Sequence, residues 1–132
     1  MPAHGPTGYA YNRTRTTYLA TELVVARSHW SRFRGLMATG ASHFRSGQGL
    51  WIAPCRGVHT FAMRFPIDVV YLDRERIVIH IEQGLRPWRL AAIRRLAASV
   101  LELPAGTVRH SQTVLGDQVD IFLQRPLDSE AA

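Results

Sequence analysis

Residues 55–73, with the sequence CRGVHTFAMRFPIDVVYLD, hold the segment that decides the fold of this 132-residue chain. Its apolar second half, Ile67 to Leu72, is followed by the charged turn 73–76 and a further apolar run from Ile77 to Ile81. Two runs rich in β-branched residues that flank a short polar turn are typical of a β-hairpin. The sequence therefore predicts that this hairpin forms the centre of a β-sheet.

Short strands are predicted on both sides of the hairpin, because β-prone runs alternate with Gly, Pro and Asp turn residues. These runs span residues 14–20, 22–26, 50–53, 58–63, 99–103 and 119–123. Helices are predicted over 28–38 and 107–114, whereas 89–98 fits a helix or a surface loop equally well. The pattern predicts a mainly β (β-rich α+β) domain: a small antiparallel β-sandwich or barrel with one or two short helices.

The length and composition predict one domain with loose ends. A chain of 132 residues can bury one stable core, and 46% hydrophobic and 20% charged residues are typical of a globular protein. The Gly- and Pro-rich residues 1–10 predict a flexible tail, residues 11–124 a single β-rich domain, and residues 125–132 a second tail.

The cellular compartment is predicted from what the sequence does not contain. It shows neither a signal peptide nor an apolar run long enough to span a bilayer. Its single cysteine, Cys55, excludes an internal disulfide. We therefore expect a soluble, bacterial-type protein of the cytoplasm, and the sequence contains no feature that sets its oligomeric state.

The net charge of +6 raises the question of nucleic-acid binding, but all 16 basic residues are arginine, a composition that biased codon usage often produces. They are spread from Arg13 to Arg125 rather than clustered. Binding to phosphates requires basic groups that are gathered on one face. We therefore expect a small molecule or a protein as the partner, and no nucleic acid.

Cys55 and His59 could act as a nucleophile and its base, the arrangement of a thiol enzyme. Four residues of extended chain would separate their Cα atoms by ~13 Å, so contact requires a turn at Arg56-Gly57. A buried, inert thiol is the simpler interpretation. The catalytic pair stays open as an alternative.

Cys55, His59 and Met63 also form a set of soft ligands, which suits copper or, with a fourth group, zinc. On a helix they would face together, but residues 58–63 precede Pro66 and are more typical of a strand. A strand would leave the imidazole and the thioether ~13 Å apart. We therefore expect no metal or other cofactor and keep the soft-metal site as an alternative.

Asp68 lies inside an apolar strand, where an unpaired carboxylate would cost several kcal/mol to bury. It should therefore have a hydrogen-bonding partner. Arg64 is the natural candidate, either in a pair that anchors the turn at Pro66 or in the wall of a pocket. Glu102 stands between two leucines, and this alternation predicts that it points outward from its strand.

Three aromatic residues, Trp51, Phe61 and Trp88, could form one wall of a pocket beside Arg86 and Arg89. Core packing is the alternative for a tryptophan in a domain of this size.

Six motifs together carry a resemblance to a known family. They are RGLM at 34–37, GLW at 49–51, HTFAMRFPIDVVYLD at 59–73, LRPW at 85–88, SVLELPAGT at 99–107 and GD at 116–117. In this order and spacing they resemble the domain-of-unknown-function 192 family, over about Tyr11 to Phe122. The resemblance implies a compact, mainly β domain with no assigned reaction, which many members carry behind a signal peptide or membrane anchor. Where the common family block reads Phe-Trp-Met-Lys-Asn, this chain has HTFAMR at 59–64 and resembles a His-Thr-Phe subset.

We therefore predict an uncharacterised, non-enzymatic module that binds a small ligand or a partner around the block from His59 to Asp68. In that site His59 donates or accepts a hydrogen bond, Arg64 contacts an anion and Asp68 orients Arg64. An enzyme that uses Cys55 and His59, or a copper or zinc protein, is the alternative. The predicted ligand-binding set is Trp51, His59, Phe61, Met63, Arg64, Asp68 and Trp88.

Overall fold

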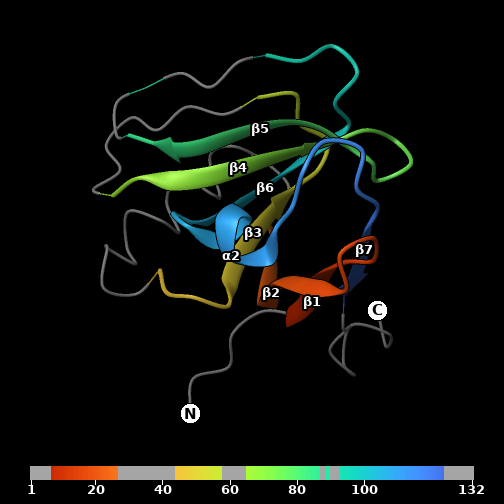
Figure 1. Cartoon of the computed structure of the whole chain (residues 1–132). Coiled ribbons are helices and arrows are strands. Elements are labelled where there is room, and N and C mark those ends of the chain that lie inside the picture. Colours follow the sequence, from red (N-terminus) through yellow and green to blue (C-terminus); the bar gives the residue numbers. More distant parts are fainter. Residues whose placement is uncertain (1–6, 27–43, 58–64, 87–88, 90–92, 124–132) are drawn as a thin grey trace, which may run out of the picture.

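The computed structural model describes residues 7–26, 44–57, 65–86, 89 and 93–123. Within them it contains strands and one short helix (Figure 1). The elements are β1 (Thr7–Asn12), β2 (Thr17–Ala26), β3 (Gln48–Ile52), β4 (Ile67–Leu72), β5 (Val78–Leu85), β6 (Ser99–Pro104), α2 (Thr107–Ser111) and β7 (Val119–Leu123). The prediction of a mainly β protein is confirmed.

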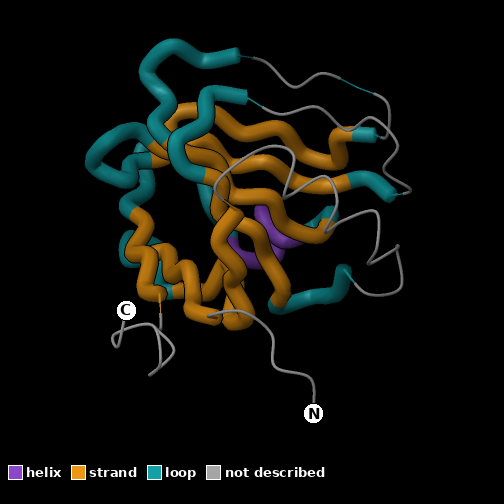
Figure 2. Tube along the Cα trace, turned by 180° about the vertical axis from the view of Figure 1, so that it is seen from behind, coloured by secondary structure: helices purple, strands orange, loops and turns teal. Residues whose placement is uncertain are grey.

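The described strands belong to one sheet, in the order β5-β4-β6-β3-β2-β1-β7. The sheet curls into a half-barrel, so that β7 at one edge comes round toward the turn before β5 at the other (Figure 1). Ile77 and Gln118 form an antiparallel bridge there, and the Val78 N–H donates to the Asp117 carbonyl over 2.9 Å. Seen from behind, α2 lies beyond the strands, on the inner side of the curl (Figure 2).

Strand directions differ from the prediction at one place. Neighbouring strands run antiparallel except β2 and β3, which are parallel, so the sheet is mixed. The parallel pairing starts at Glu22 with Gln48 and ends at Ala26 with Ile52. The first half of β2 therefore extends beyond the start of β3, and that half borders a pocket.

The β4–β5 hairpin forms as predicted, with Val70 opposite Ile81 and Tyr71 opposite His80. It lies at an edge of the sheet and not at its centre, because β5 is the last strand in the order. Every residue of β4 is nevertheless buried. Since both faces of β4 are covered, its sequence has the continuous apolar character that is typical of a central strand.

Two hydrophobic clusters cover the two faces of the sheet. The inner cluster lies within the curl and joins residues of β1, β2, β4, β6 and β7 to Val108 of α2. The outer cluster joins residues of β3, β4 and β6 to Cys55 and Phe65, which lie between strands. Because successive side chains of a strand point to opposite faces, Asp68 on β4 faces inward and Val69 outward.

The remaining elements confirm some predictions and correct others. α2 is the short helix predicted within 107–114. β1 begins at Thr7, so a strand replaces the end of the tail that was predicted for 1–10. The described residues 93–98 form no helix. The helix predicted for 28–38, the strand predicted for 58–63 and the tail 125–132 lie outside the described residues. In the part of the chain that the structure describes, no helix has the length and apolar character to cross a membrane.

Candidate functional site

A pocket of about 550 Å³ opens between the first half of β2, the loop before β3, and α2 with the turn that precedes it. Its lining residues are 18–21, 46–47, 104–107, 110 and 111. Three separate segments of the chain therefore build it. We call this space the β2–α2 pocket.

Asp68 fixes one wall of the β2–α2 pocket from inside the curl. Its carboxylate is buried, with 1% of the residue exposed, and it accepts three backbone hydrogen bonds. Oδ1 accepts from the Gly84 N–H over 2.9 Å, while Oδ2 accepts from the N–H groups of Gly106 at 3.1 Å and Val108 at 2.9 Å. The two bonds to Oδ2 hold the turn before α2 and the first turn of the helix, where backbone N–H groups have no partner within the helix, while the bond to Oδ1 holds β5.

The opposite wall is fixed by hydrogen bonds that begin in β2. The Thr17 hydroxyl donates to the Ser111 carbonyl over 2.7 Å, which joins β2 to the end of α2. The Gly47 carbonyl accepts from the N–H groups of Thr21 and Glu22 at 2.8 and 2.9 Å, which joins β2 to the loop before β3. Hydrogen bonds within the chain thus hold all three segments that build the pocket, and the pocket is largely pre-formed.

The described lining of the β2–α2 pocket mixes polar and apolar groups and carries little charge. Thr21, Ser46 and Thr107 supply hydroxyl groups, and His110 is the ionisable side chain near neutral pH among the lining residues. None of the described lining residues carries a carboxylate or a guanidinium. The described residues contain no group of three His, Cys, Asp or Glu side chains that could hold a metal ion. Such a lining can form hydrogen bonds with an uncharged polar molecule, and its described residues include no acid–base pair.

Trp51, which was predicted as a pocket wall, packs instead against the inner hydrophobic cluster. The guanidinium of Arg76 lies 4.5 Å from the centre of its ring, a cation–π contact. Its indole Nε1 is buried without a hydrogen-bond partner among the described residues. Trp51 therefore shares the inner face with Asp68 but does not line the pocket.

Cys55 lies in the outer cluster, on the other face of the sheet from Asp68. It is buried, and its Sγ lies 2.9 Å from the Gly57 carbonyl, to which the thiol donates. A thiol that donates a hydrogen bond carries its proton, so this contact favours the inert interpretation over a thiolate nucleophile.

His59, Phe61, Met63, Arg64 and Trp88 lie outside the described residues. Asp68 does have the partners that its burial required, and those that the structure describes are backbone N–H groups.

A second polar group, of which the sequence analysis named Glu102 but not the neighbours, lies on the outer face of β4, β5 and β6. Val69 pairs with Glu82 on one side and Glu102 on the other. His80 Nε2 lies 2.9 Å from Glu82 Oε2. Burial is the main cause that raises the pKa of Tyr71 above its ordinary value, and Glu82 adds to the rise.

Glu102 was predicted to point outward to solvent; it does lie on the outer face, but the expected exposure is wrong, because the residue is fully buried. Because Glu102 alternates with two leucines, the sequence indicated a strand with one face in the core and the other face in solvent. In β6 both faces are covered, so alternation does not separate buried from exposed positions.

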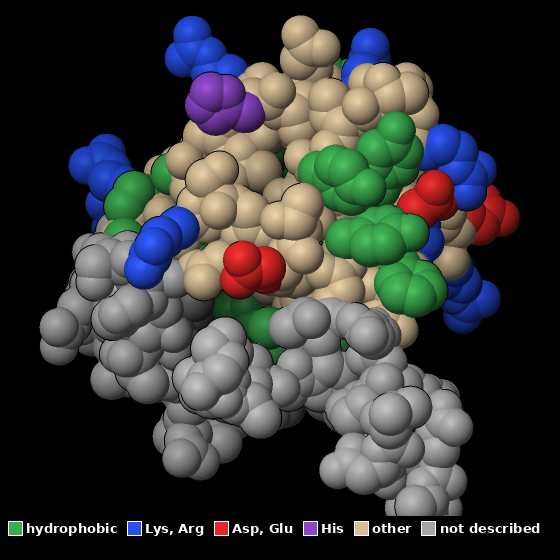
Figure 3. Space-filling view, turned by 90° about the horizontal axis from the view of Figure 1, so that it is seen from below, with side chains coloured by type: hydrophobic (Ala, Val, Ile, Leu, Met, Phe, Trp, Pro, Cys, Tyr) green, Lys and Arg blue, Asp and Glu red, His purple; other side chains and the backbone are tan. Residues whose placement is uncertain are grey.

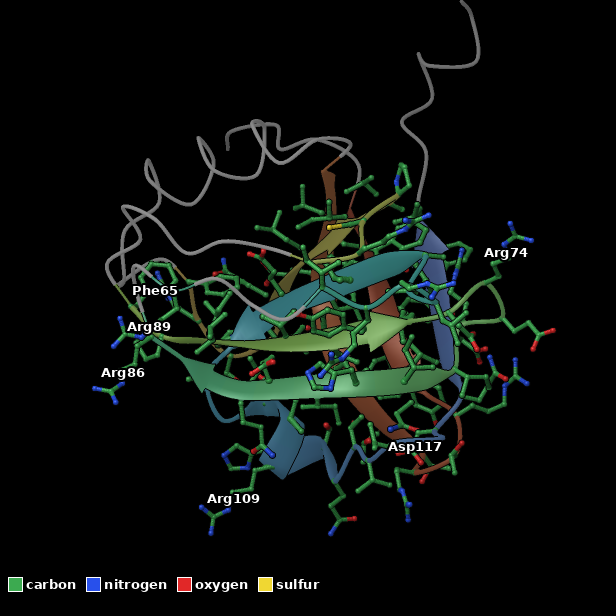
Figure 4. The ribbon with its side chains drawn as sticks, turned by 90° about the horizontal axis from the view of Figure 1, so that it is seen from above. Phe65, Arg74, Arg86, Arg89, Arg109 and Asp117 are labelled. Atoms are coloured by element: carbon green, nitrogen blue, oxygen red, sulfur yellow. The ribbon has the colours of Figure 1, made fainter. Side chains whose placement is uncertain are left out.

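The arginines that Figure 4 labels are spread over the molecule rather than gathered at the β2–α2 pocket or at the polar group of the outer face. Arg86 and Arg89 lie at one end of the sheet beside Phe65, Arg74 lies at the other end, and Arg109 projects from α2 (Figure 4). This arrangement agrees with the scattered charge of the sequence.

Comparison with known proteins places the chain in a family without an assigned reaction. The family DUF192, described as an uncharacterized ACR, matches residues 10–121. A UPF0127 protein of Thermococcus sibiricus is 29% identical over 114 residues, which cover 83% of this chain and 71% of that protein. A UPF0127 protein of Pyrococcus furiosus is 26% identical over 114 residues, covering 83% of this chain and 94% of the relative.

Solved structures share the fold at lower identity. A protein of unknown function from Novosphingobium aromaticivorans superposes with a TM-score of 0.72 at 17% identity, over 87% of this chain and 84% of that one. A protein from Sinorhizobium meliloti, whose description assigns it only provisionally to transcription regulators, gives a TM-score of 0.67 at 22% identity, over 92% and 96%. These likenesses establish the half-barrel fold alone. The family match extends over most of the chain, and the protein is therefore a member of the uncharacterised DUF192 (UPF0127) family.

Proposed function

We propose that this protein is a non-enzymatic binding module, and that it takes a small polar molecule in the β2–α2 pocket. The observation that carries the proposal is the pocket itself. Its volume of about 550 Å³ lies within the range of about 300–1,000 Å³ that is usual for small-molecule sites.

The rigidity of the walls supports binding as the function. Asp68 and the hydroxyl of Thr17 tie the two sides of the pocket to the sheet through hydrogen bonds. A site that is already formed loses less conformational entropy when a ligand enters, and this raises affinity. Of the predicted block from His59 to Asp68, Asp68 is the residue that supports this proposal. Its hydrogen bonds hold the pocket wall, although Asp68 does not line the pocket.

The chemistry of the lining favours a binding role over a catalytic one. General acid–base catalysis requires ionisable groups within hydrogen-bonding distance of the reacting atoms. Among the lining residues His110 is the candidate for such a role, and it is exposed on α2. The hydroxyl of Ser111 is already engaged by the Val108 carbonyl and by Thr113. Hydroxyl and backbone groups are suited instead to the orientation of a polyol, a small anion or an amide.

Ligand-observed NMR tests the proposal with three defined probes. Methyl β-glucoside and N-acetylglycinamide are observed by saturation-transfer difference, and inorganic phosphate is observed by ³¹P relaxation. They represent a neutral polyol, a peptide group and an anion. We expect saturable binding of at least one probe. The variant Ala105→Trp places a large ring at the exposed rim of the pocket and should abolish that binding.

The matched control is Arg74→Trp, which adds the same ring to an exposed turn at the far end of the sheet (Figure 4). It should leave binding unchanged. Failure of all three probes to bind, or binding that survives in Ala105→Trp, would refute the pocket as the site. Circular dichroism of both variants checks that the fold is retained.

A further inference from the structure

Four aromatic side chains form a contiguous group where β1, β2 and β7 adjoin, and we call this group the aromatic platform. Its members are Tyr9, Tyr11, Tyr18 and Phe122. Tyr9, Tyr18 and Phe122 are 37%, 54% and 53% exposed, which is unusual for large apolar rings. Hydrophobic side chains gather on this side of the molecule, seen from below (Figure 3).

The rings of the platform are held by one another and by strand register. Tyr9 is the cross-strand partner of Phe122, and their rings are nearly parallel, with centroids 5.3 Å apart. Tyr18 meets Tyr11 edge to face at 4.9 Å and Tyr9 at 5.8 Å. Such contacts fix the rings before any ligand arrives, so that binding would order few side chains.

The area of the platform is too small for a stable contact between two copies of the chain. An aromatic side chain offers about 150–250 Å² in full, so three rings that are roughly half exposed offer about 300 Å². A standard protein interface buries about 800 Å² on each partner. A ligand of a few flat rings matches the available area better.

The charges beside the platform favour a neutral ligand over a polyanion. Asp120 on β7 is the cross-strand partner of Tyr11, and it accepts hydrogen bonds from both Nε and Nη2 of Arg13. The guanidinium and the carboxylate thus neutralise each other at the rim. A phosphate chain would approach the carboxylate of Asp120, whereas hydroxyl groups can donate to it and accept from Arg13.

The platform continues into the β2–α2 pocket through Tyr18, which belongs to the ring cluster and also lines the pocket. Tyr18 thus joins the rings of the platform to a pocket lining that contains hydroxyl groups. A pyranose ring combines the matching features, because its C–H face packs on the electron-rich face of an aromatic ring and its hydroxyl groups form hydrogen bonds.

From this juxtaposition we propose that the platform and the pocket form one surface that binds a neutral oligosaccharide of pyranose rings. The inference rests on the proposed binding function and names its ligand class. One sugar unit occupies the β2–α2 pocket, and the next units extend over Tyr18 toward Tyr9 and Phe122.

Isothermal titration of the full chain with cellohexaose, maltohexaose and chitohexaose tests this proposal. At least one hexasaccharide should bind. Because a ring contact contributes on the order of 1 kcal/mol, Tyr9→Leu and Phe122→Leu should each weaken that binding about five- to tenfold. Both variants keep an apolar side chain and lose the flat ring; Tyr9→Leu also loses a hydroxyl group, whereas Phe122→Leu loses the ring alone. Since neither residue lines the pocket, their effect is separable from that of Ala105→Trp.

The control is Leu115→Ala, which removes another exposed apolar side chain, in the turn before β7, and should leave binding unchanged. Affinity should also change little between about 0.05 and 0.5 M NaCl, because no net charge is neutralised. If Ala105→Trp abolishes hexasaccharide binding but both leucine variants retain it, the platform is not part of the binding surface, while the pocket remains supported as the site. Failure of all three hexasaccharides, or salt-sensitive binding of oligothymidylate to the platform instead, would overturn the saccharide proposal.

Discussion

Replacement of Asp68 tests how the pocket wall is held. Its carboxylate accepts N–H groups from residues that lie 16, 38 and 40 positions away along the chain. In Asp68→Asn the side chain keeps one acceptor oxygen. If that oxygen serves Gly106 and Val108, the new NH₂ group faces the N–H of Gly84, and this part-buried donor loses its partner.

A hydrogen bond to a charged group contributes about 1.5–3 kcal/mol, so Asp68→Asn should lower the free energy of unfolding by about 2 kcal/mol. Asp68→Ala removes all three bonds and should lower it by about 4 kcal/mol, a large share of the 5–15 kcal/mol that is typical of a domain. With an unfolding entropy of about 2.1 cal/mol/K per residue, 2 kcal/mol corresponds to a fall in Tm of about 7 °C.

Urea unfolding monitored by tryptophan fluorescence measures these changes. The matched control is Asp73→Asn in the β4–β5 turn, where a partly exposed carboxylate also accepts two backbone N–H groups. It should cost less, about 1 kcal/mol or below. A loss in Asp68→Asn that is no larger than in Asp73→Asn would refute the role assigned to Asp68. Amide exchange should be faster at Gly106 and Val108 in Asp68→Ala if the reasoning holds.

Three further outcomes are expected. Burial raises the pKa of Asp117, but hydrogen bonds from Asn12, the Val114 N–H and Arg15 outweigh it and hold the pKa below its usual range. The stability from this carboxylate is present above pH of about 4 and is lost as pH falls through the lower folded pKa. Asp117→Asn should therefore flatten the curve of stability against pH in acid. An unchanged acid part of that curve would count against this role of Asp117. Burial raises the pKa of Tyr71, so the stability that its neutral phenol contributes is present below pH of about 10 and is lost at higher pH. Tyr71→Phe should therefore reduce alkaline unfolding. Equal alkaline unfolding curves of the two proteins would exclude this role. The thiol of Cys55 should react with a disulfide reagent only after denaturation, and rapid reaction of the native protein would support the thiol enzyme.

The local elements of this fold follow from the sequence because their signals are local. The β4–β5 hairpin was predictable from two apolar runs around a charged turn, and α2 from its position after a Pro-Ala-Gly break. The need of Asp68 for partners was also predictable, since burial of a lone carboxylate is costly. Its observed partners were not, because backbone N–H groups of distant residues leave no mark on side-chain patterns.

The position of the site could not be derived in the same way. Thr21, Gly47 and His110 meet at the pocket only because the parallel pairing of β2 and β3 begins at Glu22. Nothing in a single sequence sets that register. The burial of Glu102 could not be derived from the sequence either. The alternation of polar and apolar residues around it in β6 is that of a half-exposed strand, whereas in the structure the residue is fully buried.

The most direct test of the account is an amide shift map of the ¹⁵N-labelled protein during titration with the three small probes and the three hexasaccharides. The account predicts saturable shifts at Gly47, Gly106 and His110, which extend to Tyr9 and Phe122 for a hexasaccharide. Shifts confined to the outer face around His80 and Glu82, or no shift with any of these compounds, would contradict it.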